Sequence, residues 1–199
     1  VQLFGLISTY EKNLKNLLYD LQINFTYVDH GFRNASYGDH GHPDWVFGLA
    51  LCRGDVAYTL KCQLCVSAAT RDFITDIKCP LSRAAINWHE LCYVKYSNVN
   101  FFGEIDTDNK FPMQNSNYLL YNEQLYFNGT AMGLLSNLSK NATEMAGNYM
   151  FASGSASVPQ VNLHVYGMVQ CSGDLTKVNC TKCLDYAVSQ LPGLDDEDG

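Results

Sequence analysis

The sequence has little charge, and most of that charge is acidic. Asp, Glu, Lys and Arg make up 17% of its 199 residues, with 13 Lys and Arg against 20 Asp and Glu and a formal net charge of −7. Soluble domains usually carry about 25% charged residues. Nucleic-acid-binding proteins need a clustered basic surface, and no basic stripe is visible, so this class is excluded.

The sequence also lacks a long apolar run. No stretch approaches the roughly 18 apolar residues that read as a membrane-spanning helix, so no membrane span is expected in this chain. Hydrophobic residues nevertheless make up 47% of the sequence. That share is enough for a packed core and too high for a wholly disordered chain.

Cysteines and N-x-S/T triplets are abundant by contrast. There are eight cysteines and six candidate glycosylation sites: Asn24, Asn34, Asn128, Asn137, Asn141 and Asn179. A single triplet is weak evidence because it arises by chance. Six of them beside eight cysteines predict passage through an oxidising, glycosylating compartment, and therefore a secreted protein.

Comparison of the chain with itself reveals a tandem repeat. The segment VFGLALC at 46–52 matches VYGMVQC at 165–171, and each is followed by x-Gly-Asp and a C-x2-C pair. The cysteine spacings are C-x9-C-x2-C and C-x8-C-x2-C. Upstream of each copy, apolar residues at i, i+3, i+4 and i+7 predict a helix, over 14–21 and 131–138.

The repeat predicts two domains of mixed α and β structure. A period-two pattern from Ile86 to Tyr96 predicts strand structure in the first unit, and the Asp, Asn and Pro residues around 103–114 are typical of a linker. We therefore expect a first domain over 1–102, a linker over 103–114 and a second domain over 115–199 that ends in an acidic tail. Nothing after Leu191 matches 86–96, so the second domain is expected to be incomplete, with an exposed sheet edge.

The cysteine motif, the strand before it and the segments 79–80, 85–88 and 92–97 (CP, AINW and CYVKYS) together resemble the plant ginkbilobin-like cysteine-rich repeat family. This family includes cysteine-rich repeat secretory proteins, plasmodesmata-located proteins and ectodomains of cysteine-rich receptor-like kinases. The resemblance covers the chain apart from its tail. It implies an α+β fold in which each complete unit packs two helices on a five-stranded antiparallel sheet.

The resemblance also implies a disulfide pattern: Cys52 with Cys62, Cys65 with Cys92, and Cys171 with Cys180. In the family, the equivalent of Cys79 bonds a cysteine ahead of the first helix, and no cysteine precedes Cys52 here. The family partner of Cys183 would lie in the missing strands. These two cysteines are therefore expected to be unpaired or to form a fourth, non-family pair.

Two metal-binding alternatives are weaker than the disulfide interpretation. Cys62, Cys65, Cys180 and Cys183 could in principle hold zinc, but the secretory features favour disulfides. The segment 39–44, DHGHPD, contains two histidines and two aspartates but is rich in Gly and Pro, so we expect an exposed loop. No metal and no cofactor is predicted.

The sequence contains no catalytic arrangement, since His89 and Glu90 are adjacent only within the cysteine-bearing strand region. Lectin-like family members bind mannose through an Asn, an Arg and a Glu. Ile86 and Ser97 stand at the Arg and Glu positions, so that site is not carried over. The resemblance implies a non-enzymatic apoplastic protein of plant defence or stress signalling that contacts a receptor ectodomain or itself. The alternative is an antifungal protein that binds cell-wall or fungal carbohydrate at another site.

Overall fold

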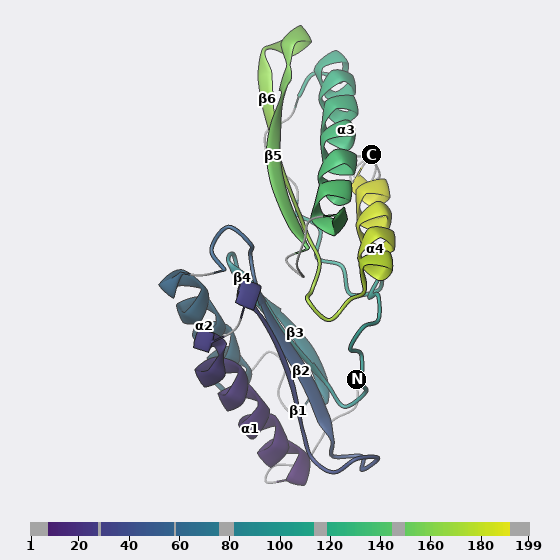
Figure 1. Cartoon of the computed structure of the whole chain (residues 1–199). Helices are drawn as coiled ribbons and strands as arrows, with labels where there is room; N and C mark the ends of the chain where they lie inside the picture. Colours follow the sequence, from purple (N-terminus) through teal and green to yellow (C-terminus); the bar gives the residue numbers. More distant parts are fainter. Residues whose placement is uncertain are drawn as a thin grey trace. The chain divides into compact units, whose positions relative to one another are not determined.

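The computed structural model describes residues 8–27, 29–57, 59–75, 82–113, 119–144 and 150–191. Cys79 and the acidic tail therefore lie outside the described residues. The chain divides into two compact units, Val1–Phe102 and Gly103–Gly199, called unit 1 and unit 2 below. Each unit is an α+β fold in which helices cover an antiparallel sheet (Figure 1), which confirms the fold class predicted from the sequence.

The described residues of unit 1 form a four-stranded antiparallel sheet in the order β1-β2-β4-β3, where the family resemblance implies five strands. Its elements are α1 (Thr9–Ile23), η1 (Asn24–Tyr27), η2 (Asp29–Gly31), β1 (Phe32–Tyr37), β2 (Val46–Cys52), α2 (Leu60–Thr75), β3 (Ala84–Trp88) and β4 (Cys92–Ser97). Helices α1 and α2 lie on the same face of this sheet (Figure 1). The central strand β2 is buried along its whole length.

Helix α1 begins at a capped residue and buries one apolar face. The Ser8 hydroxyl accepts a hydrogen bond from the Glu11 backbone N–H at 3.1 Å, which satisfies a donor that the helix itself leaves open. The buried residues of α1 are Tyr10, Leu14, Leu17, Leu18 and Leu21. Their spacing is that of a single helical face, as the leucine pattern predicts.

Asp20 joins α1 to the edge strand β1. Its carboxylate accepts hydrogen bonds from Arg33 Nη2 at 2.5 Å, from the Tyr37 hydroxyl at 3.2 Å and from the Asn24 side-chain amide. Burial by itself would raise the pKa of Asp20, but the hydrogen bonds from Asn24 and Arg33 and the Arg33 charge outweigh it and lower the pKa. The ionised carboxylate thus fixes the helix against the strand.

In its described residues, unit 2 repeats this design with a two-stranded antiparallel sheet. Its elements are α3 (Tyr121–Glu144), β5 (Phe151–Val158), η3 (Pro159–Val161), β6 (Leu163–Gln170) and α4 (Lys177–Gln190). Helix α3 lies along the hairpin and α4 lies beside α3 (Figure 1). The core between them is formed by Leu138, Ala142, Met150, Ala152, Val169, Cys171, Leu175, Cys180 and Leu184.

Each unit contains the same kind of close contact, between a glycine of its strand and a leucine of its own helix. A Cβ atom at Gly48 of β2 would lie 2.7 Å from Leu17 Cδ2, and one at Gly167 of β6 would lie 3.0 Å from Leu134 Cδ2. Glycine is therefore required wherever the helix approaches the strand this closely. The repeat found in the sequence therefore also appears in the way each unit packs its helix on its strand.

Candidate functional site: the cysteine framework and the β6 edge

The cysteines of unit 1 join one helix to two neighbouring strands. Cys52, at the end of β2, lies opposite Cys92, at the start of β4. Cys62 and Cys65 stand one turn apart on α2, so their sulfurs emerge on the same side of the helix. Disulfides join Cys52 to Cys62 (S–S 2.02 Å) and Cys65 to Cys92 (S–S 2.06 Å).

Unit 2 contains only the first of these two bridges. Cys171 is bonded to Cys180 with an S–S distance of 2.03 Å, and Cys183 carries a free thiol. All three disulfides are the pairs that the family resemblance implies. Cys62, Cys65 and Cys180 are thus not available as thiolates for zinc, and the described residues contain no cluster of three or more His, Cys, Asp or Glu that could hold a metal ion.

Cys183 is half-buried and packs against the core of unit 2. Burial raises its pKa, and the negative charge of Asp106 raises the pKa further. The thiolate is the reactive form of cysteine. The raised pKa therefore keeps Cys183 protonated, and slow to react, at a pH where an exposed cysteine already reacts.

We expect the alkylation rate of Cys183 by iodoacetamide to keep rising with pH beyond about 8.5, the ordinary pKa of a cysteine thiol. Asp106→Asn should move the rate profile to lower pH, because it removes the charge that disfavours the thiolate. Mass spectrometry of the Cys183 peptide after timed labelling measures the rate. A native profile that coincides with that of urea-unfolded protein would contradict the expectation.

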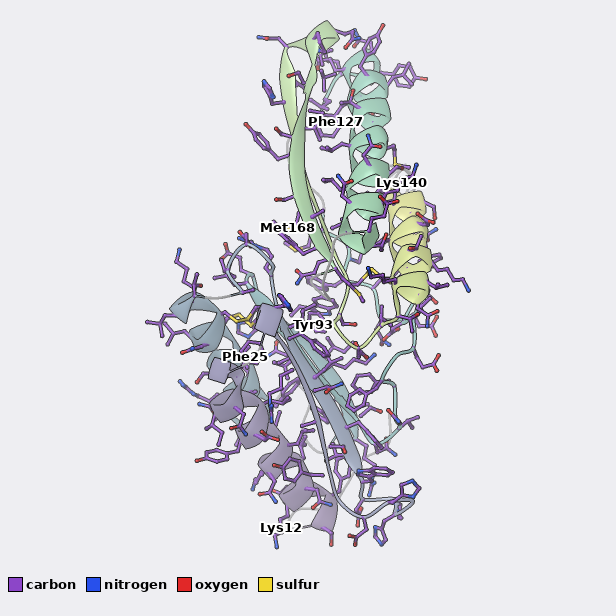
Figure 2. All side chains as sticks on the ribbon, in the orientation of Figure 1. Lys12, Phe25, Tyr93, Phe127, Lys140 and Met168 are labelled. Carbon is purple, nitrogen blue, oxygen red and sulfur yellow. A yellow bond between two sulfur atoms is a disulfide. The ribbon has the colours of Figure 1, made fainter. Side chains whose placement is uncertain are left out.

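Among the described residues, the strand β6 has a neighbouring strand on one side only. In the described part of unit 2 it pairs only with β5, whereas its counterpart β2 lies between β1 and β4. One face of the β5–β6 hairpin packs on α3 and the other points away from it, as Met168 shows in Figure 2. The outward face consists of His164, Tyr166 and Met168 opposite Ser157, Ser155 and Ser153. Tyr166 is 81% exposed.

The candidate glycosylation sites differ in accessibility. Asn34, Asn137 and Asn141 are exposed, whereas Asn24, Asn128 and Asn179 are half-buried. The Asn24 amide donates to Asp20, and the Asn179 amide donates to the Gly103 carbonyl at 3.0 Å. Glycosylation remains a prediction at all six positions, and accessibility favours the three exposed ones.

A polar cluster that the sequence did not indicate joins α2 to β3. Asp72 Oδ2 lies 2.9 Å from His89 Nε2 and accepts a hydrogen bond from Asn87 Nδ2 at 3.2 Å, while Asn87 also donates to the Ala69 carbonyl. His89 thus contacts Asp72, and its sequence neighbour Glu90 is exposed. The cluster holds a helix to an edge strand and presents no nucleophile.

The neighbouring aromatic pair and the histidine segment are surface features. The Trp88 and Tyr93 rings lie 4.6 Å apart on paired strands, and Trp88 is 46% exposed. The residues at 38–43 are all exposed, which confirms the predicted loop around the two histidines. His42 Nδ1 lies 3.8 Å from Asp44 Oδ2, and no third side chain completes a metal site among the residues described.

Two α+β units, each with a disulfide from the end of β2 or β6 to the helix that follows, define a tandem cysteine-rich repeat protein. The profile of the salt stress response/antifungal family matches residues 4–99 and 113–196, and the chain belongs to this family. The family resemblance drawn from the sequence is thereby confirmed. No helix of the described residues is long and apolar enough to cross a membrane.

Named relatives agree with this assignment. The chain is 37% identical over 189 residues to cysteine-rich repeat secretory protein 38 of Arabidopsis thaliana, covering 95% of this chain and 71% of that protein. It is 38% identical over 189 residues to an antimicrobial ginkbilobin-2-like protein of Castanea crenata, covering 95% and 73%. The relatives confirm the predicted class of secretory, extracellular proteins.

A solved structure shares the fold. The crystal structure of the tandem DUF26 ectodomain of PDLP8, a cysteine-rich receptor-like protein of Arabidopsis thaliana, superposes with a TM-score of 0.77 at 22% sequence identity. The match covers 96% of this chain and 84% of the ectodomain. It establishes the tandem arrangement of two such units as a known extracellular fold.

Proposed function

We propose that this protein acts in plant defence or stress signalling as a non-enzymatic binding protein that contacts the extracellular part of a receptor. The observation that carries the proposal is the outward face of the β5–β6 hairpin. Tyr166 and Met168 project from β6 beside a row of three serines on β5. Antibody binding loops are enriched in the same two residue types, because tyrosine gives contact area at low entropic cost and serine gives adaptable hydrogen bonds.

The position of the exposed sequons supports this choice of face. Asn137 and Asn141 lie on α3, which packs on the opposite side of the hairpin from Tyr166 and Met168. Glycans at these two positions would leave the outward hairpin face uncovered. The ectodomain of a cysteine-rich receptor-like protein shares this fold. Receptor ectodomains of this class are therefore the first partners to test.

The test is surface plasmon resonance between the full chain and a panel of cysteine-rich receptor-like kinase ectodomains. We expect at least one ectodomain to bind, and Tyr166→Ala with Met168→Ala to weaken that binding at least about tenfold, the loss expected for a contact residue at the centre of an interface. Tyr121→Ala on α3 is the matched control, because Tyr121 is 88% exposed but lies on the helix. Absence of binding across the panel, or equal loss in both variants, would reject the proposal.

A second candidate function is carbohydrate binding, and the exposed Trp88 favours it. Aromatic rings provide the apolar platform on which sugar rings stack, and Tyr93 holds the Trp88 ring at 4.6 Å. A glycan array of mannans, glucans and cell-wall polysaccharides tests this function. Binding abolished by Trp88→Ala would support it, and an array without hits would remove it.

A further inference from the structure

Helices α1 and α2 of unit 1 have a common outer face, on the side away from the sheet. The two helices lie side by side (Figure 1), and Gln22 Nε2 of α1 donates a hydrogen bond to Ser67 Oγ of α2 at 2.9 Å. Tyr19 and Ile23 lie within one helical turn of Gln22, and Leu64 lies within one turn of Ser67. The large apolar residues exposed on this outer face, each 43–67% exposed, are Tyr19, Ile23, Leu60, Leu64 and Ile74.

Unit 2 has polar residues at three of the five matching positions. The contact with the strand glycine aligns Leu17 with Leu134, and the cysteine motif aligns Cys62 with Cys180. The counterparts of Tyr19, Ile23 and Leu64 are then Ser136, Lys140 and Lys182. All three counterparts are exposed. The shared fold therefore does not require the apolar residues of unit 1, and a group of such residues on one face marks an interaction site.

The charges exposed on α1 and α2 are all positive, although the chain as a whole has a formal net charge of −7. The three carboxylates of the two helices are only partly exposed, and each contacts a basic side chain: Glu11 contacts Lys15, Asp20 contacts Arg33 and Asp72 contacts His89. The exposed cations of the two helices are Lys12, Lys15, Lys61 and Arg71. The outer face thus combines apolar residues with positive charge, which selects a negatively charged partner.

We propose that the outer face of α1 and α2 binds an amphipathic helix of a partner protein, whose apolar stripe is flanked by Asp and Glu residues. Tyr19 and Ile23 are spaced i and i+4 on α1, and Leu60 and Leu64 have the same spacing on α2. A third helix matches this spacing with apolar anchors at i, i+3, i+4 and i+7. Its flanking carboxylates pair with the lysines and with Arg71, which gives the interface an apolar centre and a charged rim.

Other anionic partners fit this face less well. An acidic polysaccharide would use the cations and the ring of Tyr19, but it has no apolar side chain to cover Ile23, Leu60 and Leu64. A membrane is disfavoured because relatives of this chain are secretory proteins, and anionic lipids are concentrated in the cytoplasmic leaflet. The face belongs to unit 1, whereas the proposed receptor contact uses the β5–β6 hairpin of unit 2. The inference therefore adds a second binding surface.

The test is fluorescence anisotropy with the full chain and three labelled peptides of about 20 residues, long enough to form a helix. The first peptide has leucines at helical spacing on one side and glutamates on the flanks. The second has lysine in place of each glutamate, and the third has the composition of the first in scrambled order. We expect the first peptide to bind at least about tenfold more tightly than the other two. Its affinity should fall as salt rises from about 0.05 M to about 0.5 M, because salt screens exposed charges.

Substitutions in the apolar part of the face should weaken this binding. Tyr19→Ser with Leu64→Ser should reduce the affinity for the acidic peptide at least about tenfold, as expected for residues at the centre of an interface. The matched control is Tyr121→Ser with Val178→Ser, which removes an exposed tyrosine and an exposed aliphatic residue from the two helices of unit 2. The control variant should bind as the native protein does.

A charge reversal provides a gain of binding that a misfolded variant cannot give. Lys12→Glu with Arg71→Glu should weaken binding of the acidic peptide and make the basic peptide the tighter ligand. Both side chains are exposed, and a glutamate in the first turn of α1 suits the helix dipole. Circular dichroism checks that the variant retains its helices. Loss of the acidic peptide without gain of the basic one would contradict the assigned role of these two cations.

Three further results would overturn the inference. Equal binding of the acidic and basic peptides would show that the face has no charge preference. Equal binding of the ordered and scrambled acidic peptides would show that it recognises negative charge without an apolar stripe. Tighter binding to polygalacturonate, or to vesicles of phosphatidylserine, than to the acidic peptide would assign the face to a polysaccharide or a membrane. Receptor binding by the hairpin is measured separately, so either proposal can fail while the other holds.

Discussion

Replacing both Cys65 and Cys92 with alanine should lower the free energy of unfolding of unit 1 by about 3.6 kcal/mol on the loop-entropy account. The bridge closes a loop of 27 residues, the longest of the three disulfide loops, and cutting it frees the unfolded chain. A domain of this size is stable by only about 5–15 kcal/mol. The double variant should therefore be marginal at 37 °C.

Tryptophan fluorescence measures this effect in one unit, because both tryptophans, Trp45 and Trp88, belong to unit 1. Urea unfolding should show a lower midpoint and a steeper slope, because the unfolded chain without the bridge exposes more surface. Cys183→Ala is the control, because it removes a sulfur that forms no bridge, and its fluorescence midpoint should stay within experimental error of the native one. A shift of the double variant below about 1 kcal/mol would show that the bridge adds little.

The second large effect is expected at Gly48, where valine should cost unit 1 about 3 kcal/mol or more. A Cβ atom there would lie 2.7 Å from Leu17 Cδ2 and 3.2 Å from the Lys95 carbonyl oxygen. Leu17 is fully buried and cannot turn away, so either the helix moves from the sheet or the strand bends.

A double-mutant cycle separates this contact from a general effect of valine. Leu17→Ala alone should cost about 2–5 kcal/mol, and the double variant should cost clearly less than the sum of the two single variants, because the shortened side chain makes room for the valine. Gly41→Val is the control: no atom lies within 4 Å of a Cβ there, although its φ of 76° adds a backbone cost of about 1–2 kcal/mol. Additive effects of Gly48→Val and Leu17→Ala would contradict the proposed packing.

The repeat made much of the fold predictable from the sequence. The leucine helices, the central strands and the cysteine turns were all indicated by local periodicity or by matching between the two halves. Disulfide pairing was not available from spacing, since eight cysteines allow 105 connectivities, and it followed only from the family resemblance. The sheet register explains the pairing afterwards, because it places Cys52 beside Cys92 under one turn of α2.

What sequence reasoning missed depends on contacts between distant residues. The alternation from Ile86 to Tyr96 is continuous in the sequence, but the structure divides it into β3 and β4 of one hairpin. Trp88 pairs with Tyr93, so even-numbered residues face outward on β3 and inward on β4. The period-two pattern of a sequence does not reveal such a change of face across a turn.

The same limit applies to the candidate site. The sequence identified Cys183 as a cysteine without a family partner and predicted an open sheet edge. It did not indicate that Asp72 contacts Asn87 and His89, because these residues lie 15 and 17 positions apart in the sequence. The sequence also predicts a linker over 103–114. In the structure, the Gly103 backbone N–H donates to Asp174 Oδ2 and the Gly103 carbonyl accepts from the Asn179 side-chain amide, both within unit 2.

The unequal cross-linking of the two units also gives them different extensibility under tension. A stretched chain gains about 3.4 Å per residue, so the loops closed by Cys52–Cys62 and Cys65–Cys92 withhold about 110 Å of contour length from unit 1. The single loop in unit 2 withholds only about 25 Å. A pull on the two ends of the chain would therefore lengthen unit 2 further than unit 1, although the two units have similar numbers of residues.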